Sequence, residues 1–195
     1  MRSHTGMRPQ DILVLLKMVV WGSADTRYVL RLVPTPSGLK RAKEGWRQLD
    51  LAHELGLSQG EVTESLNRSR IARLVDADKR QPMRKALLDF LLHGVQYVFP
   101  ALPGAIVRGM PTAHSAPPLS NTIVDSEEKF VWPDEEGEVR GQAIVPLYPT
   151  VPAATRRDPR LHELLTLVDA LRVGRAREQK LAREELERRL MEPKS

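Results

Sequence analysis

The chain has 195 residues, of which 41% are hydrophobic and 28% are charged, and its formal net charge is +5. This length and balance are typical of a soluble globular protein with one or two domains, and the positive charge favours an anionic partner. The sequence contains no cysteine, which excludes disulfides and thiolate metal sites and fits a cytoplasmic protein.

The N-terminal segment predicts a helix and no membrane association. Its first ten residues, MRSHTGMRPQ, are polar and lack a signal-peptide pattern. The apolar run at 12–21 contains Lys17 and is shorter than the about 20 residues that span a bilayer. Pro9 suits the first turn of a helix, and apolar residues follow at helical spacing, namely Ile12, Leu15, Leu16 and Val19. We therefore expect a helix over residues 9–21.

Residues 22–46 are typical of an insertion between two predicted helices. Gly22-Ser23 and the stretch PTPSG at 34–38 break regular structure. Between them, the segment from Tyr28 to Val33 predicts a short strand.

Residues 47–70, RQLDLAHELGLSQGEVTESLNRSR, predict two short helices joined by a tight turn. Gly56 can take the positive φ that such a turn needs, and the small side chain of Ala52 lets the helices approach closely. Ser58 can cap the second helix, with Glu61 three residues later to complete a capping box. The two helices share one apolar face, made of Leu51, Leu55, Leu57, Val62 and Leu66. This pattern indicates a helix-turn-helix.

The outward face of the second helix carries polar side chains that suit nucleic acid. Gln59, Thr63, Asn67 and Arg70 can read base edges or hold phosphates. The region directly after this face is basic, with Arg68, Arg70, Arg73, Lys79, Arg80, Arg84 and Lys85. We therefore predict a site for double-stranded DNA made of Ser58, Gln59, Thr63, Asn67, Arg68, Arg70 and Arg73.

Two alternatives stay open at this site. The two helices can also be read as a hairpin that packs within a domain and binds no ligand. The basic run Lys40, Arg41 and Lys43 of the insertion would either be mobile or contact DNA.

The segment 47–75 resembles the LxxxLGLSQxxVxxxLxRL stretch of MarR-like and related winged-helix regulators of bacteria. The resemblance implies a winged-helix domain that binds DNA through the second helix. The chain departs from that pattern in two places. It has Arg47 where the family often has Ser or Thr, and it has Arg70-Ile71 at the position that often opens a final hydrophobic pair.

The residues after this segment predict the rest of a first domain, residues 9–94. The stretch 71–75 is expected as a first wing strand, with a turn at 76–79. A helix is predicted from Met83 to His93, ending at Gly94. The apolar run 95–99 then predicts a strand.

The remaining region, 95–195, begins with a proline-rich stretch. Ten of the 15 prolines fall between residues 100 and 159. Short strands are expected at 105–107, 130–132 and 143–145, and an extended segment at 111–118. An acidic cluster at 125–138 is expected in a solvated loop.

The C-terminus predicts two helices. Asp158 can cap the first, with Pro159 at its first position. Its buried stripe would comprise Leu161, Leu164, Leu165, Val168 and Leu171, and Gly174 would break or bend it. A highly charged helix follows from about residue 175 to 190 and would pack on a second copy or on the chain's own core. We expect deletion of residues 158–195 to abolish tight DNA binding and to leave residues 9–93 able to fold.

No pattern in the sequence supports an enzyme, a metal site or a cofactor. The chain has no HExxH, GxxxxGK[ST] or GxGxxG motif. His114, in the segment PTAHSAPP, is the one histidine in a loop rich enough to suggest an active site, but no partner for it can be named. It is better interpreted as a loop histidine that bonds a backbone carbonyl.

We therefore expect an α+β, mostly α protein: an N-terminal winged-helix-like domain, a proline-rich region of short strands and C-terminal helices. The predicted function is a sequence-specific transcriptional regulator, a repressor acting as a homodimer. The alternative is an antitoxin or defence-operon interaction protein that binds a partner protein through residues 95–190 and regulates its own operon through the helix-turn-helix.

Overall fold

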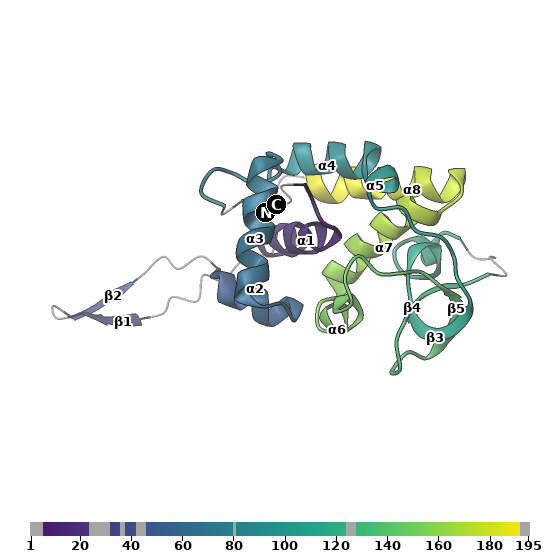
Figure 1. Cartoon of the computed structure of the whole chain (residues 1–195), viewed down its shortest axis with the longest axis horizontal. Coiled ribbons are helices and arrows are strands. Elements are labelled where there is room, and N and C mark those ends of the chain that lie inside the picture. The colour runs from purple at the N-terminus through teal and green to yellow at the C-terminus, as the bar shows by residue number, and fades with distance from the viewer. Residues whose placement is uncertain are drawn as a thin grey trace, which may run out of the picture.

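The computed structural model describes residues 6–23, 32–35, 38–41, 46–79, 81–123 and 128–191. They form an α+β fold that is mostly helical, as predicted (Figure 1). The helices are α1 (Pro9–Ser23), α2 (Gln48–Leu55), α3 (Gln59–Ile71), α4 (Arg84–His93), α5 (Val95–Val98), α6 (Val151–Arg156), α7 (Pro159–Val173) and α8 (Ala176–Met191).

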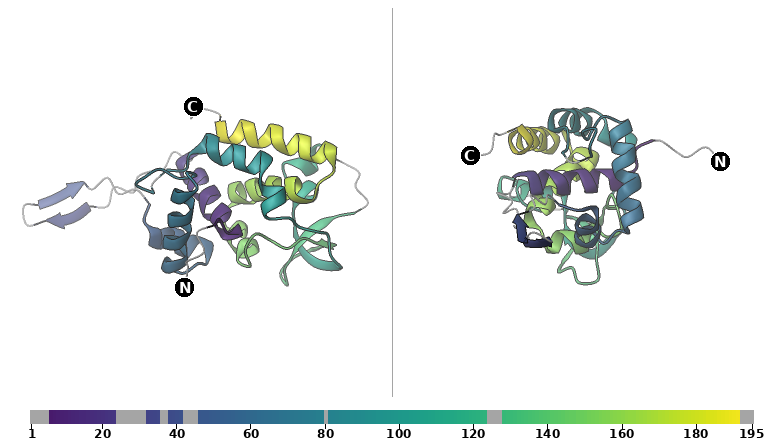
Figure 2. Two further views of the ribbon diagram at one scale, coloured as in Figure 1. Left: turned by 45° about the horizontal axis from the view of Figure 1, so that its top comes forward. Right: turned by 90° about the vertical axis from the view of Figure 1, so that its left-hand side faces the viewer.

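Helix α1 is the centre of the core. Every residue from Asp11 to Val20 is buried, as expected for a helix that is apolar on all sides. Helices α2 and α3 contact α1, and so does α7, so α1 crosses the middle of the molecule (Figure 2). The helix predicted at 9–21 is confirmed, and it extends two residues further.

The two buried charged residues of α1, Asp11 and Lys17, have partners far along the chain. Lys17 Nζ lies 3.1 Å from Glu54 Oε2 of α2 and 2.8 Å from Asp158 Oδ2 at the start of α7. Arg84 Nη1, in α4, donates to the Leu190 carbonyl of α8. The predicted boundary between two domains, at residues 94 and 95, stays a prediction. The contacts of Lys17 with Asp158 and of Arg84 with Leu190 connect residues on the two sides of that boundary.

A small three-stranded unit follows α5. Strand β3 (Ile106–Pro111) pairs antiparallel with both β4 (Phe130–Pro133) and β5 (Val139–Ala143), and β4 pairs parallel with β5. At Gly109 a Cβ would come within 2.0 Å of the Trp132 carbonyl oxygen, so glycine permits this close approach. Buried Asp169 of α7 accepts hydrogen bonds from Trp132 Nε1 and Thr112 Oγ1, which joins the strands to α7.

The C-terminal helices follow the sequence prediction closely. Asp158 Oδ1 accepts from the backbone N–H of Leu161, with Pro159 in the first turn of α7. The predicted apolar stripe of α7 is buried. Helix α7 ends at Val173, and Gly174 caps it before α8 begins. Helix α8 packs on α7 and α4.

Several predicted strands are wrong or shifted. Residues 95–98 form helix α5, because Val95 and Phe99, four apart, are buried while Tyr97 and Val98 face solvent. The segment 111–118 contains a 3₁₀ turn, η1 (Ala113–Ser115), and a second turn, η2 (Leu119–Asn121), follows. The third predicted strand lies earlier, at β5, and ends at Ala143.

The insertion at 22–46 contains a two-stranded hairpin. Strand β1 (Leu32–Thr35) pairs antiparallel with β2 (Gly38–Arg41). Most of the strand predicted over 28–33 lies outside the described residues. Lys43 also lies outside them. Among the helices that the structure describes, none has the length and apolar character needed to cross a bilayer.

Candidate nucleic-acid interface

Helices α2 and α3 meet at a tight turn centred on Gly56. Its φ of 64° lies in the left-handed region, and its backbone N–H donates to the Ala52 carbonyl. This conformation favours glycine, so the sequence prediction at this position is confirmed. A Cβ at Gly56 would lie 3.3 Å from Thr150 Cγ2, so the turn also packs against the segment before α6.

The N-terminus of α3 has the predicted capping box. Ser58 Oγ accepts from the Glu61 backbone N–H at 3.1 Å, and Glu61 Oε2 accepts from the Ser58 N–H at 2.8 Å. The Ser58 hydroxyl therefore closes the helix end.

Tyr148, which the sequence did not implicate, completes this corner. Its hydroxyl donates to Glu61 Oε1 at 2.7 Å. That hydrogen bond, followed by those from Ser58, lowers the pKa of Glu61. The same bond raises the pKa of Tyr148. The segment at 148–150 thus holds both the turn and the start of α3.

The inner face of α3 is fixed to α1. Val62 and Leu66 are fully buried, as predicted. Arg68 is only 5% exposed and binds Asp11 with two hydrogen bonds, Nε to Oδ2 at 2.9 Å and Nη2 to Oδ1 at 2.6 Å. The hydrogen bond with Asp11 raises the pKa of Arg68.

Arg68 therefore does not fit its predicted role as a phosphate contact. Its guanidinium lies on the α1 side of α3, and the carboxylate of Asp11 occupies it. The single acidic residue of α1, at the start of a largely apolar helix, is the signal that the sequence offered, because a buried carboxylate needs a partner.

The outer face of α3 carries the predicted base-reading residues. Gln59 is exposed, and Thr63 and Asn67 are half-buried. The Thr63 hydroxyl can donate to Gln48 Oε1 at 2.7 Å or to the Gln59 carbonyl at 2.9 Å. Exposed Glu64 lies on the same face, and sequence reasoning missed it. The face is thus polar and contains one carboxylate.

A hairpin over residues 74–83, called the 74–83 hairpin below, follows α3. Val75 forms a single antiparallel bridge with Pro82, and the Met83 N–H donates to the Leu74 carbonyl at 2.9 Å. The turn predicted at 76–79 is present, but the strand predicted over 71–75 is only this one bridge, because α3 continues to Ile71.

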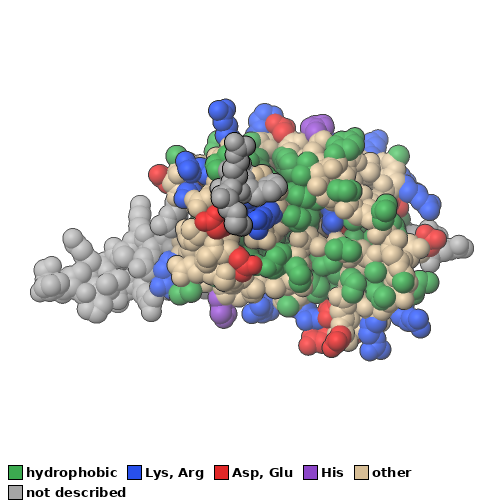
Figure 3. Space-filling model, viewed as in Figure 1, with side chains coloured by type: hydrophobic (Ala, Val, Ile, Leu, Met, Phe, Trp, Pro, Cys, Tyr) green, Lys and Arg blue, Asp and Glu red, His purple; other side chains and the backbone are tan. Residues whose placement is uncertain are grey.

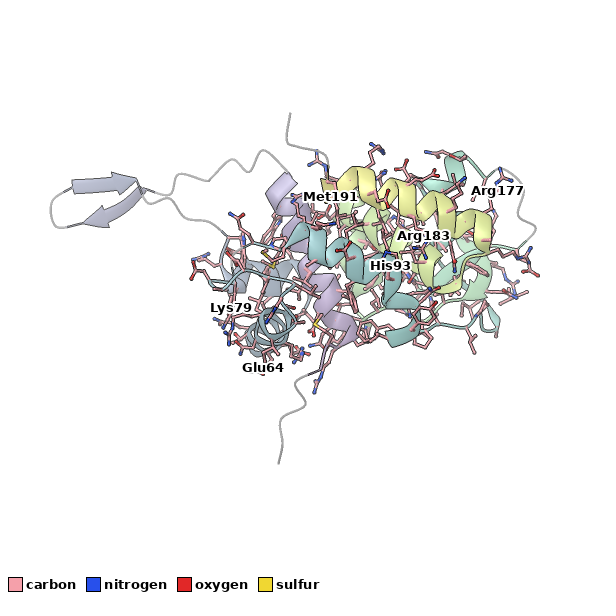
Figure 4. All side chains as sticks on the ribbon, turned by 90° about the horizontal axis from the view of Figure 1, so that it is seen from above. Glu64, Lys79, His93, Arg177, Arg183 and Met191 are labelled. Carbon is pink, nitrogen blue, oxygen red and sulfur yellow. The ribbon has the colours of Figure 1, made fainter. Side chains whose placement is uncertain are left out.

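The 74–83 hairpin contacts the outer face of α3 through Lys79. Lys79 Nζ donates to Asn67 Oδ1 at 2.6 Å. Figure 4 shows α3 nearly end-on, with Lys79 and Glu64 on its outer side. Arg70 and Arg73 are exposed, and within the described residues neither has a carboxylate partner. These two cations remain available to phosphates.

The predicted loop histidine has a structural role. His114 is buried, its Nε2 lies 2.8 Å from the Glu128 carbonyl oxygen, and its ring meets Phe130 edge-on. The predicted bond to a backbone carbonyl is therefore confirmed. No group of three metal-ligating side chains occurs in the part of the chain that the structure describes.

The region after α4 exposes apolar side chains. Tyr97 is 75% exposed and Leu102 85%, and Val98, Ile106 and Val145 are at least half exposed. Arg172 of α7 donates to the carbonyls of Phe99 and Val145. The segments that carry Val98 and Val145 are therefore both joined to α7. We call these five side chains the apolar surface. Figure 3 shows hydrophobic side chains gathered over the centre and right of the molecule.

Comparison with known proteins found no matching family model, no matching curated protein and no matching solved structure.

Proposed function

We propose that the protein binds double-stranded DNA sequence-specifically through α3 and acts as a winged-helix-like transcriptional regulator. The observation that carries this proposal is the two-sided character of α3. Its inner face is buried at Val62 and Leu66 and joined to α1 by Arg68, while its outer face presents polar groups to solvent. An α-helix held in this way fits the major groove of DNA, where base edges are distinguishable.

The roles of the outer residues follow from their positions. Gln59, Thr63 and Asn67 would contact base edges, and Arg70 and Arg73 would neutralise phosphates beside them. Ser58 would lie where the capped end of α3 approaches the backbone of DNA. The 74–83 hairpin would serve as the wing.

The regulator would act as a dimer. One helix reads few base pairs, and helix-turn-helix proteins usually bind two half-sites about 34–36 Å apart. Repression is the simplest consequence of occupying such an operator.

Selection of bound fragments from genomic DNA, followed by a salt titration, tests the proposal. Arg70→Ala should weaken binding to all sequences about equally and reduce the salt slope by about one. The matched control is Arg177→Ala, an exposed arginine of α8 at the far end of the molecule (Figure 4). Equal salt slopes for the two variants would contradict a phosphate contact at Arg70, and no enriched fragment would contradict the proposed function.

A second candidate function is an antitoxin or defence-operon interaction protein that binds a protein through residues 95–190. The five exposed side chains of the apolar surface favour it, because a partner protein that covered them would remove apolar area from water. Co-expression with the protein encoded beside this one, followed by light scattering of the purified complex, tests it. Leu102→Asp should dissociate that complex while leaving DNA binding unchanged.

A further inference from the structure

The contact between Lys79 and Asn67 fixes which atoms of Asn67 face a base. The Lys79 ammonium has only donors, so the amide atom 2.6 Å from Nζ is the oxygen. The amide nitrogen then lies on the other side, where it donates to Glu64 Oε1 at 3.5 Å. Lys79 therefore takes one of the two lone pairs of the Asn67 oxygen, and Glu64 accepts one of the two amide N–H groups, which leaves one N–H to donate to a base.

Lys79 is held in place for this contact. Its backbone N–H donates to the Asp76 carbonyl at 3.0 Å, within the turn that the bridge between Val75 and Pro82 closes. Its side chain is half-buried, unlike the exposed Arg70 and Arg73. Lys79 is thus built into the 74–83 hairpin as a partner of α3.

We propose that Lys79 is a positioning residue that makes Asn67 contact a base mainly as a donor, so that this part of α3 prefers guanine to adenine. The inference rests on the proposed DNA-binding function. Asparagine recognises adenine with both amide atoms, the oxygen accepting from N6 and the nitrogen donating to N7. The Lys79 ammonium takes one lone pair of that oxygen and places a positive charge beside it, which disfavours the approach of the N6 amino group and weakens the bidentate contact.

Guanine suits the group that remains. Its major-groove edge offers two adjacent acceptors, N7 and O6, whereas thymine offers O4 alone beside a methyl group. The carboxylate of Glu64, one turn earlier on α3, only accepts, and it matches the N4 amino group of the paired cytosine. Asn67 and Glu64 together therefore complement the two bases of one G·C pair.

The test compares base preferences in a selection from randomised DNA. The relevant position is the one whose preference disappears in Asn67→Ala. The wild-type protein should prefer guanine over adenine there by about tenfold, and Lys79→Met should abolish or invert that ratio. Lys79→Arg should keep it, because arginine also only donates. Lys85→Met is the control for loss of one positive charge: Lys85, on α4, is 79% exposed, and the variant should keep the guanine preference.

Two results would overturn the inference alone. One is sequence-specific binding in which Lys79→Met weakens all sites equally and leaves the guanine preference unchanged, which would make Lys79 a phosphate contact. The other is a wild-type preference for adenine at the Asn67 position. A wild-type protein that selects no sequence at all would overturn the proposed function and this inference with it.

Discussion

Two arginines that lie two residues apart on α3 have opposite environments, because they belong to opposite faces of the helix. Arg68 points inward, is buried and binds Asp11 of α1, whereas Arg70 points to solvent and has no carboxylate partner in the described structure. Both belong to the same basic run of the sequence. The difference teaches that charge density along a recognition helix does not by itself identify phosphate contacts. The face on which an arginine lies determines whether it is available to a phosphate. A buried carboxylate on a neighbouring helix, here Asp11, can pair with an arginine of the inner face.

The largest expected effect on stability comes from removing the C-terminal helices, since α7 packs against α1, to which the inner face of α3 is joined. Deleting residues 158–195 removes α7 and α8, and with them the cover of α1 and the Asp158 partner of Lys17. We expect the remaining chain not to fold, because the central apolar helix would lose its cover and Lys17 would lose one of its two carboxylate partners. Circular dichroism and thermal melting measure this. A cooperative transition in the truncated protein would instead show that the chain folds without α7 and α8, which agrees with the sequence prediction that residues 9–93 can fold without them.

Separating the two arginines is the next test. Arg68→Ala leaves the Asp11 carboxylate buried without its partner, so it should lower the free energy of unfolding by about 3–5 kcal/mol. Arg70→Ala should change it by less than about 0.5 kcal/mol, because the side chain is exposed. Urea unfolding of both variants measures the difference. Similar losses would mean that the two faces are not distinct.

Two glycines near the start of α3, one in the turn and one in the helix, test the turn through a smaller expected change in stability. Gly56→Ala should destabilise the protein by about 1–2 kcal/mol, because alanine disfavours the left-handed turn and its Cβ would press on Thr150. Gly60→Ala should be neutral or stabilising by up to about 1 kcal/mol, since Gly60 lies within α3 and a Cβ there would make an ordinary contact with Ser58 Oγ at 3.9 Å. The same urea measurements apply. Equal effects of the two changes would contradict a special role for the turn.

The smallest effect concerns the corner where Tyr148 meets α3. Tyr148→Phe removes one hydrogen bond to Glu61 and should cost about 1 kcal/mol at neutral pH. Because the folded pKa of Glu61 is lowered, its contribution is complete above the ordinary carboxyl pKa and is lost as pH falls through the lower folded value. The wild-type protein should therefore lose more stability on acidification than the variant. Tyr97→Phe, at an exposed position, is the control, and parallel pH profiles for wild type and Tyr148→Phe would contradict this coupling.

Much of the helical framework was predictable because its signals are local. The capped starts of α3 and α7 and the left-handed turn at Gly56 depend on residues within about four positions of one another. The strand predicted at 95–99 was wrong for the opposite reason. A short apolar run has no clear period, and contacts with the rest of the chain selected the helix.

The candidate site divides in the same way. The sequence by itself determined that α3 would be a capped helix with Gln59, Thr63 and Asn67 on one side and Val62 and Leu66 on the other, because helical spacing assigns residues to faces.

Only the tertiary structure decided the pairings that give this helix its chemistry. Arg68 meets Asp11 across 57 residues, Tyr148 meets Glu61 across 87, and Lys79 meets Asn67 across 12. No local preference encodes such partners. They are selected because a buried or half-buried polar group loses its water and must find a complementary group wherever the packed helices bring one within reach.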